Sequence, residues 1–302
     1  MEKQEKTVLL IVNPVAGKKT IQPHIGQIVR IFMDAGYLVT SMVTAQRGEA
    51  TELVKRYGRN HSLIVCTGGD GTFHEVLRGA AEERLNVPLG YIPCGTTNDF
   101  AHSYGLSTDI LTAARNIVSG QSRRCDIGRY GEQYFSYLAS FGAFTWMGYT
   151  TDQSLKNKLG YTAYVLEGVR DLPKVRPIHM KIALDGVPYE DDYLFGAVAN
   201  TASIAGIIEL PKAMVDPCDG KFEVVLIKAP KTIFELELIA RSLRTQEIAS
   251  CPLIELHQAQ DIWVDNPPEL NWSLDGESSG IHKTVHITPV QGFLNLLGCN
   301  QD

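Results

Sequence analysis

The hydrophobic pattern of the first 125 or so residues alternates between short apolar runs and longer segments with helical spacing. The short runs are typical of buried strands and the longer segments of amphipathic helices. The expected strands are 7–12, 37–44, 63–65 and 88–92. The expected helices are 23–35, 49–57, 73–83, 96–103 and 110–119. This alternation predicts a doubly wound α/β domain, in which helices cover both faces of a parallel sheet.

After about residue 126 the pattern changes to strand-like segments with few helices. Strands are expected at 134–144, 179–184, 193–199, 222–228, 251–257, 261–264 and 283–288, and helices at 155–172 and 233–245. Asp185-Gly186 is a hairpin signal, because Asp-Gly suits the positive-φ positions of a tight turn. This half is therefore expected to be an antiparallel β-sandwich domain. The predicted division is 1–127, completed by the apolar tail 290–302, and 128–289.

Glycine-rich segments follow the expected strands of the first half, at the edge where parallel sheets bind ligands. Segment 68–72 reads Gly-Gly-Asp-Gly-Thr and opens a helix. Glycine lets a phosphate approach the main chain, and helix N-termini attract phosphate. Segment 95–99, Gly-Thr-Thr-Asn-Asp, repeats this arrangement after the next strand. Each segment alone is also an ordinary helix cap, but two on neighbouring strands favour a phosphate cradle.

Two further segments carry weaker signals. Segment 13–19, Asn-Pro-Val-Ala-Gly-Lys-Lys, ends the first strand and places two lysines where phosphates would lie. It lacks the spacing of a P-loop, so a solvated lysine turn is the alternative. Thr44 and Glu49, beside Gly48, give only a helix-capping signal.

Acidic residues supply the candidate metal and proton-transfer chemistry. Asp70, Asp99 and Asp126 could jointly hold Mg²⁺ through water, although Asp126 could instead pair with a neighbouring arginine at the surface. Segment 216–221, Asp-Pro-Cys-Asp-Gly-Lys, could bind a metal or form a simple β-turn. Asp275-Gly276 is a turn that would lift Glu277 out of a strand, where a carboxylate could act as a general base.

Composition narrows the functional classes. The 302-residue chain is 44 % hydrophobic and 21 % charged, and its net charge of −6 gives no global signal for nucleic-acid binding. Its six cysteines form no C-x-x-C pair, which fits reduced thiols in a cytoplasmic protein. The polar N-terminus lacks a signal region, and no apolar run approaches the roughly 20 residues of a membrane span. A lipid-handling role would therefore require peripheral membrane docking.

Taken together in this order, these motifs resemble the diacylglycerol kinase catalytic-domain family, which includes sphingosine and ceramide kinases. The resemblance runs from about Val8 to Leu297 and is nearest to the soluble bacterial lipid kinases. It implies that ATP is bound by Asn13, Pro14, Val15, Ala16, Gly17, Lys18, Thr44, Gly68, Gly69, Asp70, Gly71, Thr72, Phe73, His74, Glu75 and Thr96. It implies a water-bridged Mg²⁺ network at Asp70, Asp99 and Asp126, and a structural Mg²⁺ at Asp216, Asp219 and Lys221.

The resemblance also implies a reaction, in which a lipid hydroxyl, most simply that of diacylglycerol, receives the γ-phosphoryl group. The soluble bacterial kinases use the glutamate of the Asp-Gly-Glu turn as proton acceptor, which maps to Glu277, whereas sphingosine kinases use the residue that maps to Asp70. We favour Glu277 as the base and Asp70 as the metal organiser. We expect the protein to bind a lipid at a membrane surface and not to bind nucleic acid. The sequence leaves open whether it forms a homodimer. An NAD kinase, and an inactive nucleotide- or lipid-binding regulator, are the alternatives.

Overall fold

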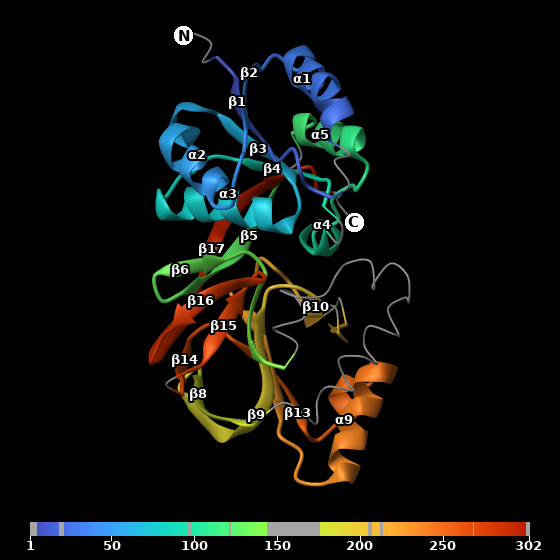
Figure 1. Ribbon diagram of the computed structural model, residues 1–302, viewed down its shortest axis with the longest axis vertical. Helices are drawn as coiled ribbons and strands as arrows, with labels where there is room; N and C mark the ends of the chain where they lie inside the picture. Colours follow the sequence, from blue (N-terminus) through green and yellow to red (C-terminus); the bar gives the residue numbers. More distant parts are fainter. Residues whose placement is uncertain are drawn as a thin grey trace. The chain divides into compact units, whose positions relative to one another are not determined.

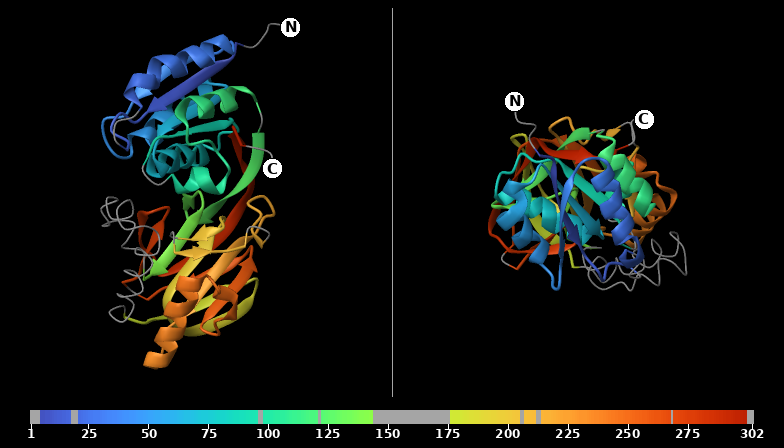
Figure 2. Two further views of the ribbon diagram at one scale, coloured as in Figure 1. Left: turned by 90° about the vertical axis from the view of Figure 1, so that its right-hand side faces the viewer. Right: turned by 90° about the horizontal axis from the view of Figure 1, so that it is seen from above.

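The computed structural model describes residues 5–17, 21–95, 98–120, 122–143, 176–204, 207–211, 214–267 and 269–299. The chain forms two compact units, Met1–Asp126 with Gln291–Asp302, and Ile127–Val290. It passes between them within two long strands, β5 (Ser122–Tyr130) and β17 (Thr284–Leu297), drawn in green and red in Figure 2. The expected helix 155–172, Lys18 and Thr96 lie outside the described residues.

The first unit contains a parallel sheet in the order β4-β3-β1-β2, with the end of β17 parallel to β4. Its strands are β1 (Thr7–Val12), β2 (Leu38–Val43), β3 (Leu63–Gly68) and β4 (Leu89–Pro93). Strand β2 lies on one side of β1, whereas β3 and then β4 lie on the other side, so the strand order reverses between β1 and β3. In folds of this kind ligands bind beyond the carboxyl ends of the strands at that point.

Helices cover the two faces of this sheet (Figure 1). They are α1 (Ile25–Asp34), α2 (Glu49–Tyr57), α3 (Asp70–Glu82), α4 (Asp99–Ser103) and α5 (Ile110–Val118), with 3₁₀ turns η1 (Gln22–His24) and η2 (Gly58–Asn60). Helix α1 contacts α5, and α2 contacts α3. On the α1/α5 side, Val8 and Leu10 share a core with Ile28, Phe32 and Ile117. The predicted α/β domain with parallel strands is confirmed.

The second unit is a β-rich, sandwich-like domain, as predicted. Its sheet order is β16-β15-β7-β9-β8-β14-β17, and β12 pairs with both β9 and β13. The strands are β6 (Gln133–Phe135), β7 (Leu138–Gly142), β8 (Ile178–Leu184), β9 (Val187–Ala199), β10 (Ser203–Ile204), β11 (Ile208–Glu209), β12 (Phe222–Lys228), β13 (Ile254–Ala259), β14 (Ile262–Asp265), β15 (Asn271–Leu274) and β16 (Glu277–Ile281). Helix α9 (Ile233–Thr245) packs through Ile239 and Leu243, and a 3₁₀ turn, η5 (Ile248–Ser250), follows it.

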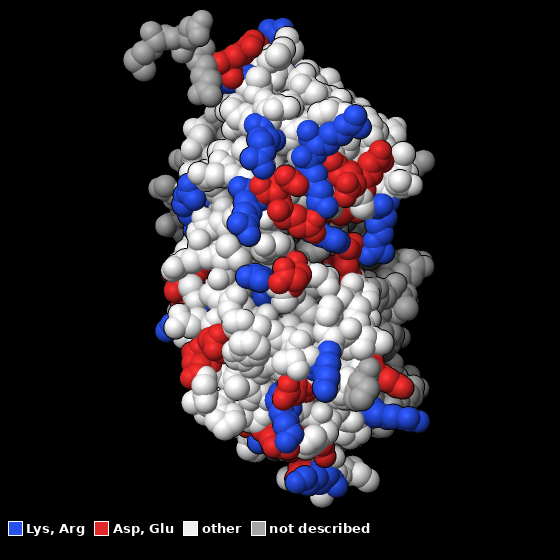
Figure 3. Space-filling view, turned by 90° about the vertical axis from the view of Figure 1, so that its left-hand side faces the viewer, with Lys and Arg blue, Asp and Glu red and all other residues white. Residues whose placement is uncertain are grey.

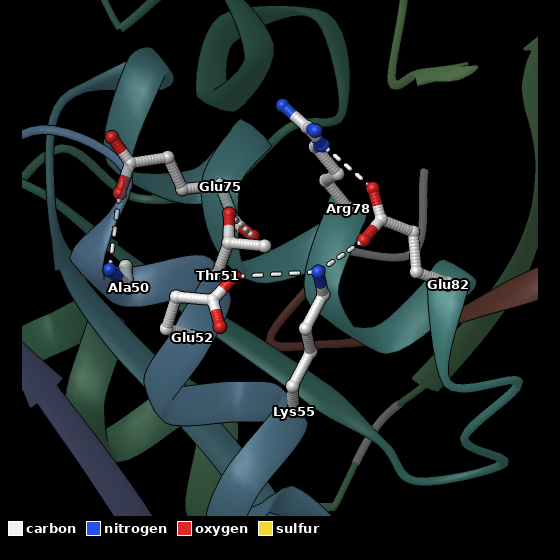
Figure 4. A network of polar contacts seen from close by, with 7 residues as sticks. All are labelled: Ala50, Thr51, Glu52, Lys55, Glu75, Arg78 and Glu82. Atoms are coloured by element: carbon white, nitrogen blue, oxygen red, sulfur yellow. Dashed lines mark hydrogen bonds and ion pairs between the residues drawn. The ribbon is translucent and has the colours of Figure 1, made fainter.

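Acidic and basic side chains are interleaved on the face of the molecule shown in Figure 3. On helices α2 and α3, Glu82 contacts both Lys55 and Arg78, and Lys55 also contacts Glu52 at 3.3 Å (Figure 4). Burial alone would raise the pKa of Glu82, but hydrogen bonds from Lys55 and Arg78 outweigh it and lower the pKa below the ordinary 4.5. The network therefore stabilises the packing of α2 on α3 when Glu82 is ionised.

Replacing Glu82 by Gln is expected to lower the free energy of unfolding by about 0.5–1 kcal/mol at pH 7. Because the folded-state pKa lies below the unfolded one, this stabilisation is present above about pH 4.5 and is lost as the pH falls through the folded value. Urea unfolding at pH 7 and pH 4 measures the difference, which should shrink at pH 4. Glu83→Gln is the control: among the described residues the Glu83 carboxylate pairs with the exposed Arg59 at 3.5 Å, so this substitution should change stability little.

Candidate active site

Loops after β1 and β3 are joined by hydrogen bonds where the strand order reverses. The Asn13 backbone N–H donates to the Thr67 carbonyl at 2.9 Å, and the Asn13 side-chain amide donates to the Thr72 hydroxyl at 2.9 Å. The Asn13 amide oxygen accepts from the Val15 N–H at 3.1 Å, which closes the turn over Pro14. Asn13 thus fixes the loop after β1 to the first turn of α3.

Three glycines let these loops pack main chain against main chain. A Cβ atom added at Gly95 would lie 2.6 Å from the Cα atom of Gly69. A Cβ atom added at Gly17, whose φ is +55°, would lie 2.3 Å from the carbonyl oxygen of Cys94. The structure therefore brings together the loops after β1, β3 and β4, and only glycine fits at Gly17 and Gly95.

Asp70 is the first residue of α3, and its carboxylate holds the start of α4. One oxygen accepts the Asp99 N–H at 2.9 Å, and the other accepts the Phe100 N–H at 3.2 Å and the Tyr91 hydroxyl at 3.4 Å. Burial, and then the charge of Asp99, raise the pKa of Asp70 to about 6. Sequence reasoning missed Tyr91, whose hydroxyl also reaches Asn98 at 3.4 Å; a tyrosine in a fully buried strand was the available signal.

Glu75, one turn further along α3, holds the start of α2. Its two oxygens accept the Gly48 N–H at 2.8 Å and the Ala50 N–H at 3.1 Å. Its carbonyl accepts the Thr51 hydroxyl at 2.9 Å, and Figure 4 shows Glu75 with Ala50 and Thr51. The carboxylate therefore satisfies N–H groups that lack partners within α2, at the end where negative charge is favourable. Together, Asp70 and Glu75 let α3 position the helices on either side of it.

Other predicted nucleotide contacts are constrained by burial. Thr44 continues β2, since its N–H donates to the Val12 carbonyl at 2.9 Å. Phe73 is fully buried and stacks on Tyr91 at 4.8 Å between ring centroids, and His74 is also buried. Phe73 and His74 could therefore face a nucleotide mainly through backbone atoms. Gly68 is the last residue of β3, Gly71 lies in the first turn of α3, and Pro14 and Ala16 lie on the loop after β1.

Asp126 does not lie at the surface, so the sequence-based alternative of a surface arginine partner is wrong. Its side chain is fully buried, and one carboxylate oxygen accepts the Gly292 N–H at 2.6 Å. Arg124 instead donates to the Gly292 carbonyl at 3.1 Å. The structure thus ties Asp126 to the strand that completes the first unit, whereas Asp70 and Asp99 are close enough for their charges to interact.

The neighbouring carboxylates of Asp70 and Asp99 fit a divalent cation held through water. Like charges this close repel, and Mg²⁺ favours carboxylate oxygens while keeping several waters. Within the part of the chain that the structure describes, no three Asp, Glu, His or Cys side chains gather closely enough to ligate one ion directly. A water-bridged network with Asp126 remains a prediction.

The segment from Asp216 to Lys221 forms a turn in the second unit, which was one of its two predicted forms. Oxygens of Asp216 and Asp219 accept the Cys218 and Lys221 N–H groups at 3.1 and 2.9 Å. Burial, and then the charges of Asp219 and Asp216, raise the pKa of the nearby Glu223 to about 7. One Glu223 oxygen is buried without a hydrogen-bond partner among the described residues. This concentration of negative charge fits the predicted cation.

Glu277 follows the turn between β15 and β16. The φ angles of Asp275 and Gly276 are +49° and +86°, as in a type I′ hairpin, and Glu277 pairs with Leu274. Glu277 is half-buried at the first position of β16. The predicted turn is therefore present, with the candidate base directly after it.

Comparison with known proteins gives a consistent result. Residues 7–130 match the model of the diacylglycerol kinase catalytic domain, and residues 147–297 match that of the YegS C-terminal NAD kinase beta sandwich-like domain. A diacylglycerol kinase of Bacillus subtilis (strain 168) is 33 % identical over 279 residues, 91 % of each chain. One of Staphylococcus saprophyticus is 31 % identical over 277 residues, covering 91 % of this chain and 90 % of that protein. A diacylglycerol kinase crystal structure from Bacillus anthracis strain Sterne matches with a TM-score of 0.79 and 27 % identity over 99 % of both chains.

Proposed function

Because the chain belongs to the diacylglycerol kinase catalytic domain family, we propose that it transfers the γ-phosphoryl group of ATP to a lipid hydroxyl, and that this lipid is diacylglycerol. Family membership implies lipid kinase activity and the use of ATP. The choice of diacylglycerol rests on the names of the relatives. The product would be phosphatidate.

The observation that best supports this proposal is the convergence of the loops that carry Gly17, Gly69 and Gly95. Closely packed glycine loops at the strand ends present main-chain N–H groups without Cβ atoms, which suits the phosphates of a nucleotide. In phosphoryl transfer the protein mainly positions the reactants and neutralises charge. The first unit would hold ATP in this way, with Lys18 adding a positive charge.

In the proposed reaction, the lipid hydroxyl oxygen attacks the γ-phosphorus. The bond between that phosphorus and the β–γ bridging oxygen breaks, and ADP leaves with the bond's electron pair. Glu277 accepts the hydroxyl proton as the new oxygen–phosphorus bond forms. Mg²⁺, held near Asp70 and Asp99, would supply charge neutralisation for the nucleotide phosphates.

Since the substrate is a membrane lipid, we also propose that the protein works in the cytoplasm and reaches the bilayer peripherally. None of the helices among the described residues is long and apolar enough to span a membrane. Whether the protein acts as a homodimer is a separate expectation that analytical ultracentrifugation would address.

Incubation with γ-labelled ATP and a panel of acceptors tests the proposal. The panel contains diacylglycerol, ceramide, sphingosine and monoacylglycerol in vesicles, and NAD in solution. We expect label on diacylglycerol, with at least about a tenfold higher kcat/KM than on any other acceptor, because buried polar groups that match one headgroup reject others strongly. Label on NAD alone would favour an NAD kinase, and ATP that is bound but never consumed would favour a regulator.

A further inference from the structure

The carboxylate of Asp275 is buried among hydrogen-bond donors. Ser136 donates to one oxygen through both its N–H and its hydroxyl, the hydroxyl at 2.6 Å. The N–H groups of Tyr137 and Leu138 donate to the other oxygen at 3.0 and 2.9 Å. Only 7 % of Asp275 is exposed. Successive N–H groups aimed at one anion form a nest, and hydrogen bonds to an ionised group are the strong ones.

A hairpin turn does not require this arrangement. The Asp185-Gly186 turn between β8 and β9 has similar φ angles, +48° and +83°. The carboxylate of Asp185 accepts two N–H groups, from Gln260 and Asp261, at 3.0 and 2.9 Å. Among the described residues, the Asp275 carboxylate therefore accepts at least four hydrogen bonds, against two for Asp185, and it does so in a buried position.

These contacts fix the strand that carries Glu277. Among the described residues, β16 is the last strand in the sheet order and pairs only with β15. At its start, Asp275 fastens the turn to the segment between β6 and β7, and the Asp275 N–H donates to the Leu138 carbonyl at 2.8 Å. Two residues beyond Glu277, the Ser279 carbonyl accepts from the Gln133 side chain at 2.7 Å. Glu277 thus lies on an edge strand that is anchored on both sides of it.

We propose that Asp275 is a positioning residue, whose buried carboxylate holds the hairpin so that Glu277 is correctly placed to accept the hydroxyl proton. This inference rests on the proposed function, because it gives Glu277 the role of base. A general base must lie within hydrogen-bond reach of the proton that it takes. A displacement of about 1 Å can lower turnover about 100-fold.

Asp275→Asn is the variant that tests this role. Asn also adopts the positive φ of the turn, but it replaces one acceptor oxygen by an NH₂ group that faces donors. We expect kcat to fall about 10- to 100-fold, with the KM for ATP changed less than about twofold. Asp185→Asn is the matched control and should retain full turnover.

A double-mutant cycle shows whether Asp275 acts through Glu277. In the Glu277→Gln background, Asp275→Asn should lower the residual turnover by less than about twofold, because the residue that it positions is already gone. The proposal would be overturned if Asp275→Asn kept the wild-type kcat, or if Asp185→Asn lowered kcat as much as Asp275→Asn does. It would also be overturned if Asp275→Asn lowered turnover as much in the Glu277→Gln background as in the wild type. If Asp275→Asn does not fold, Ser136→Ala removes one donor only and should lower kcat about two- to tenfold, again only when Glu277 is present.

Amide hydrogen exchange provides a readout that is independent of activity. Asp275→Asn should speed exchange at least about tenfold in residues 277–281, whereas Asp185→Asn should leave that segment unchanged. Unchanged exchange in Asp275→Asn would overturn the positioning role. If the wild-type protein phosphorylates no lipid, the proposed function fails, but the exchange experiment still decides whether Asp275 holds the strand.

Discussion

Glu277→Gln is expected to lower turnover about 10²- to 10⁴-fold, because an amide of nearly the same shape cannot accept the hydroxyl proton. ATP binding should stay within about twofold of the wild type, since the proposed nucleotide contacts lie on loops of the first unit. Single-turnover assays with labelled ATP measure the chemical step, and calorimetry measures ATP affinity. Equal losses of turnover and of ATP affinity would show that Glu277 is structural.

The comparison with Asp70 makes this test sharper, because the resemblance left both acids as candidate bases. Both Asp70 oxygens accept backbone N–H groups at the start of α4. Asp70→Asn should therefore disturb the loop after β4 and weaken ATP binding together with turnover. If Asp70→Asn abolished turnover while ATP affinity and stability were unchanged, Asp70 would be the better candidate for the base.

Local signals in the sequence predicted much of the fold. Helix α9 begins where expected, because Thr232 and Glu235 form a capping box ahead of an apolar periodicity. Strand β12 is a continuous buried run, and it also has the predicted bounds. Helix α3 begins at Asp70, three residues before the expected start, because glycines at its N-terminus hide the helical pattern.

Strands whose neighbours are remote in sequence were harder to predict. Strand β5 was missed because its first residues, including Arg123 and Arg124, are exposed and break the apolar pattern. Strand β17 was expected only as a short strand, 283–288, and a separate apolar tail. It is one strand of 14 residues whose middle is only half-buried. Periodicity cannot reveal such strands, since their burial changes along their length.

The candidate site shows the same limit. Glycine segments identified the loops, because glycine marks close approach whatever lies opposite. The partners of the buried acids were not predictable: Glu75 reaches Ala50, 25 residues away, and Asp275 reaches Ser136, 139 residues away. An isolated Asp or Glu gives the same local signal whether it binds a metal, a nucleotide or a helix terminus. Only the tertiary structure shows that Asp70, Glu75 and Asp275 each accept backbone N–H groups.

Gly95→Ala is expected to weaken ATP binding at least about tenfold and to lower the free energy of unfolding by about 1–3 kcal/mol. The new methyl group would lie 2.6 Å from the Cα atom of Gly69 and 2.8 Å from the side-chain oxygen of Asn98. Backbone atoms cannot move aside as the end of a flexible side chain can, so the loops after β3 and β4 must separate.

Gly26→Ala is the matched control, because Gly26 lies in α1 and an added Cβ would meet no atom within 4 Å. It should leave ATP affinity unchanged and raise the free energy of unfolding by about 0.5 kcal/mol, since alanine favours helix. Calorimetric ATP titration and urea unfolding of both variants measure these effects. If Gly95→Ala bound ATP as tightly as Gly26→Ala, the nucleotide phosphates could not depend on the contact between these two glycine loops. The proposed ATP site would then have to be sought elsewhere in the protein.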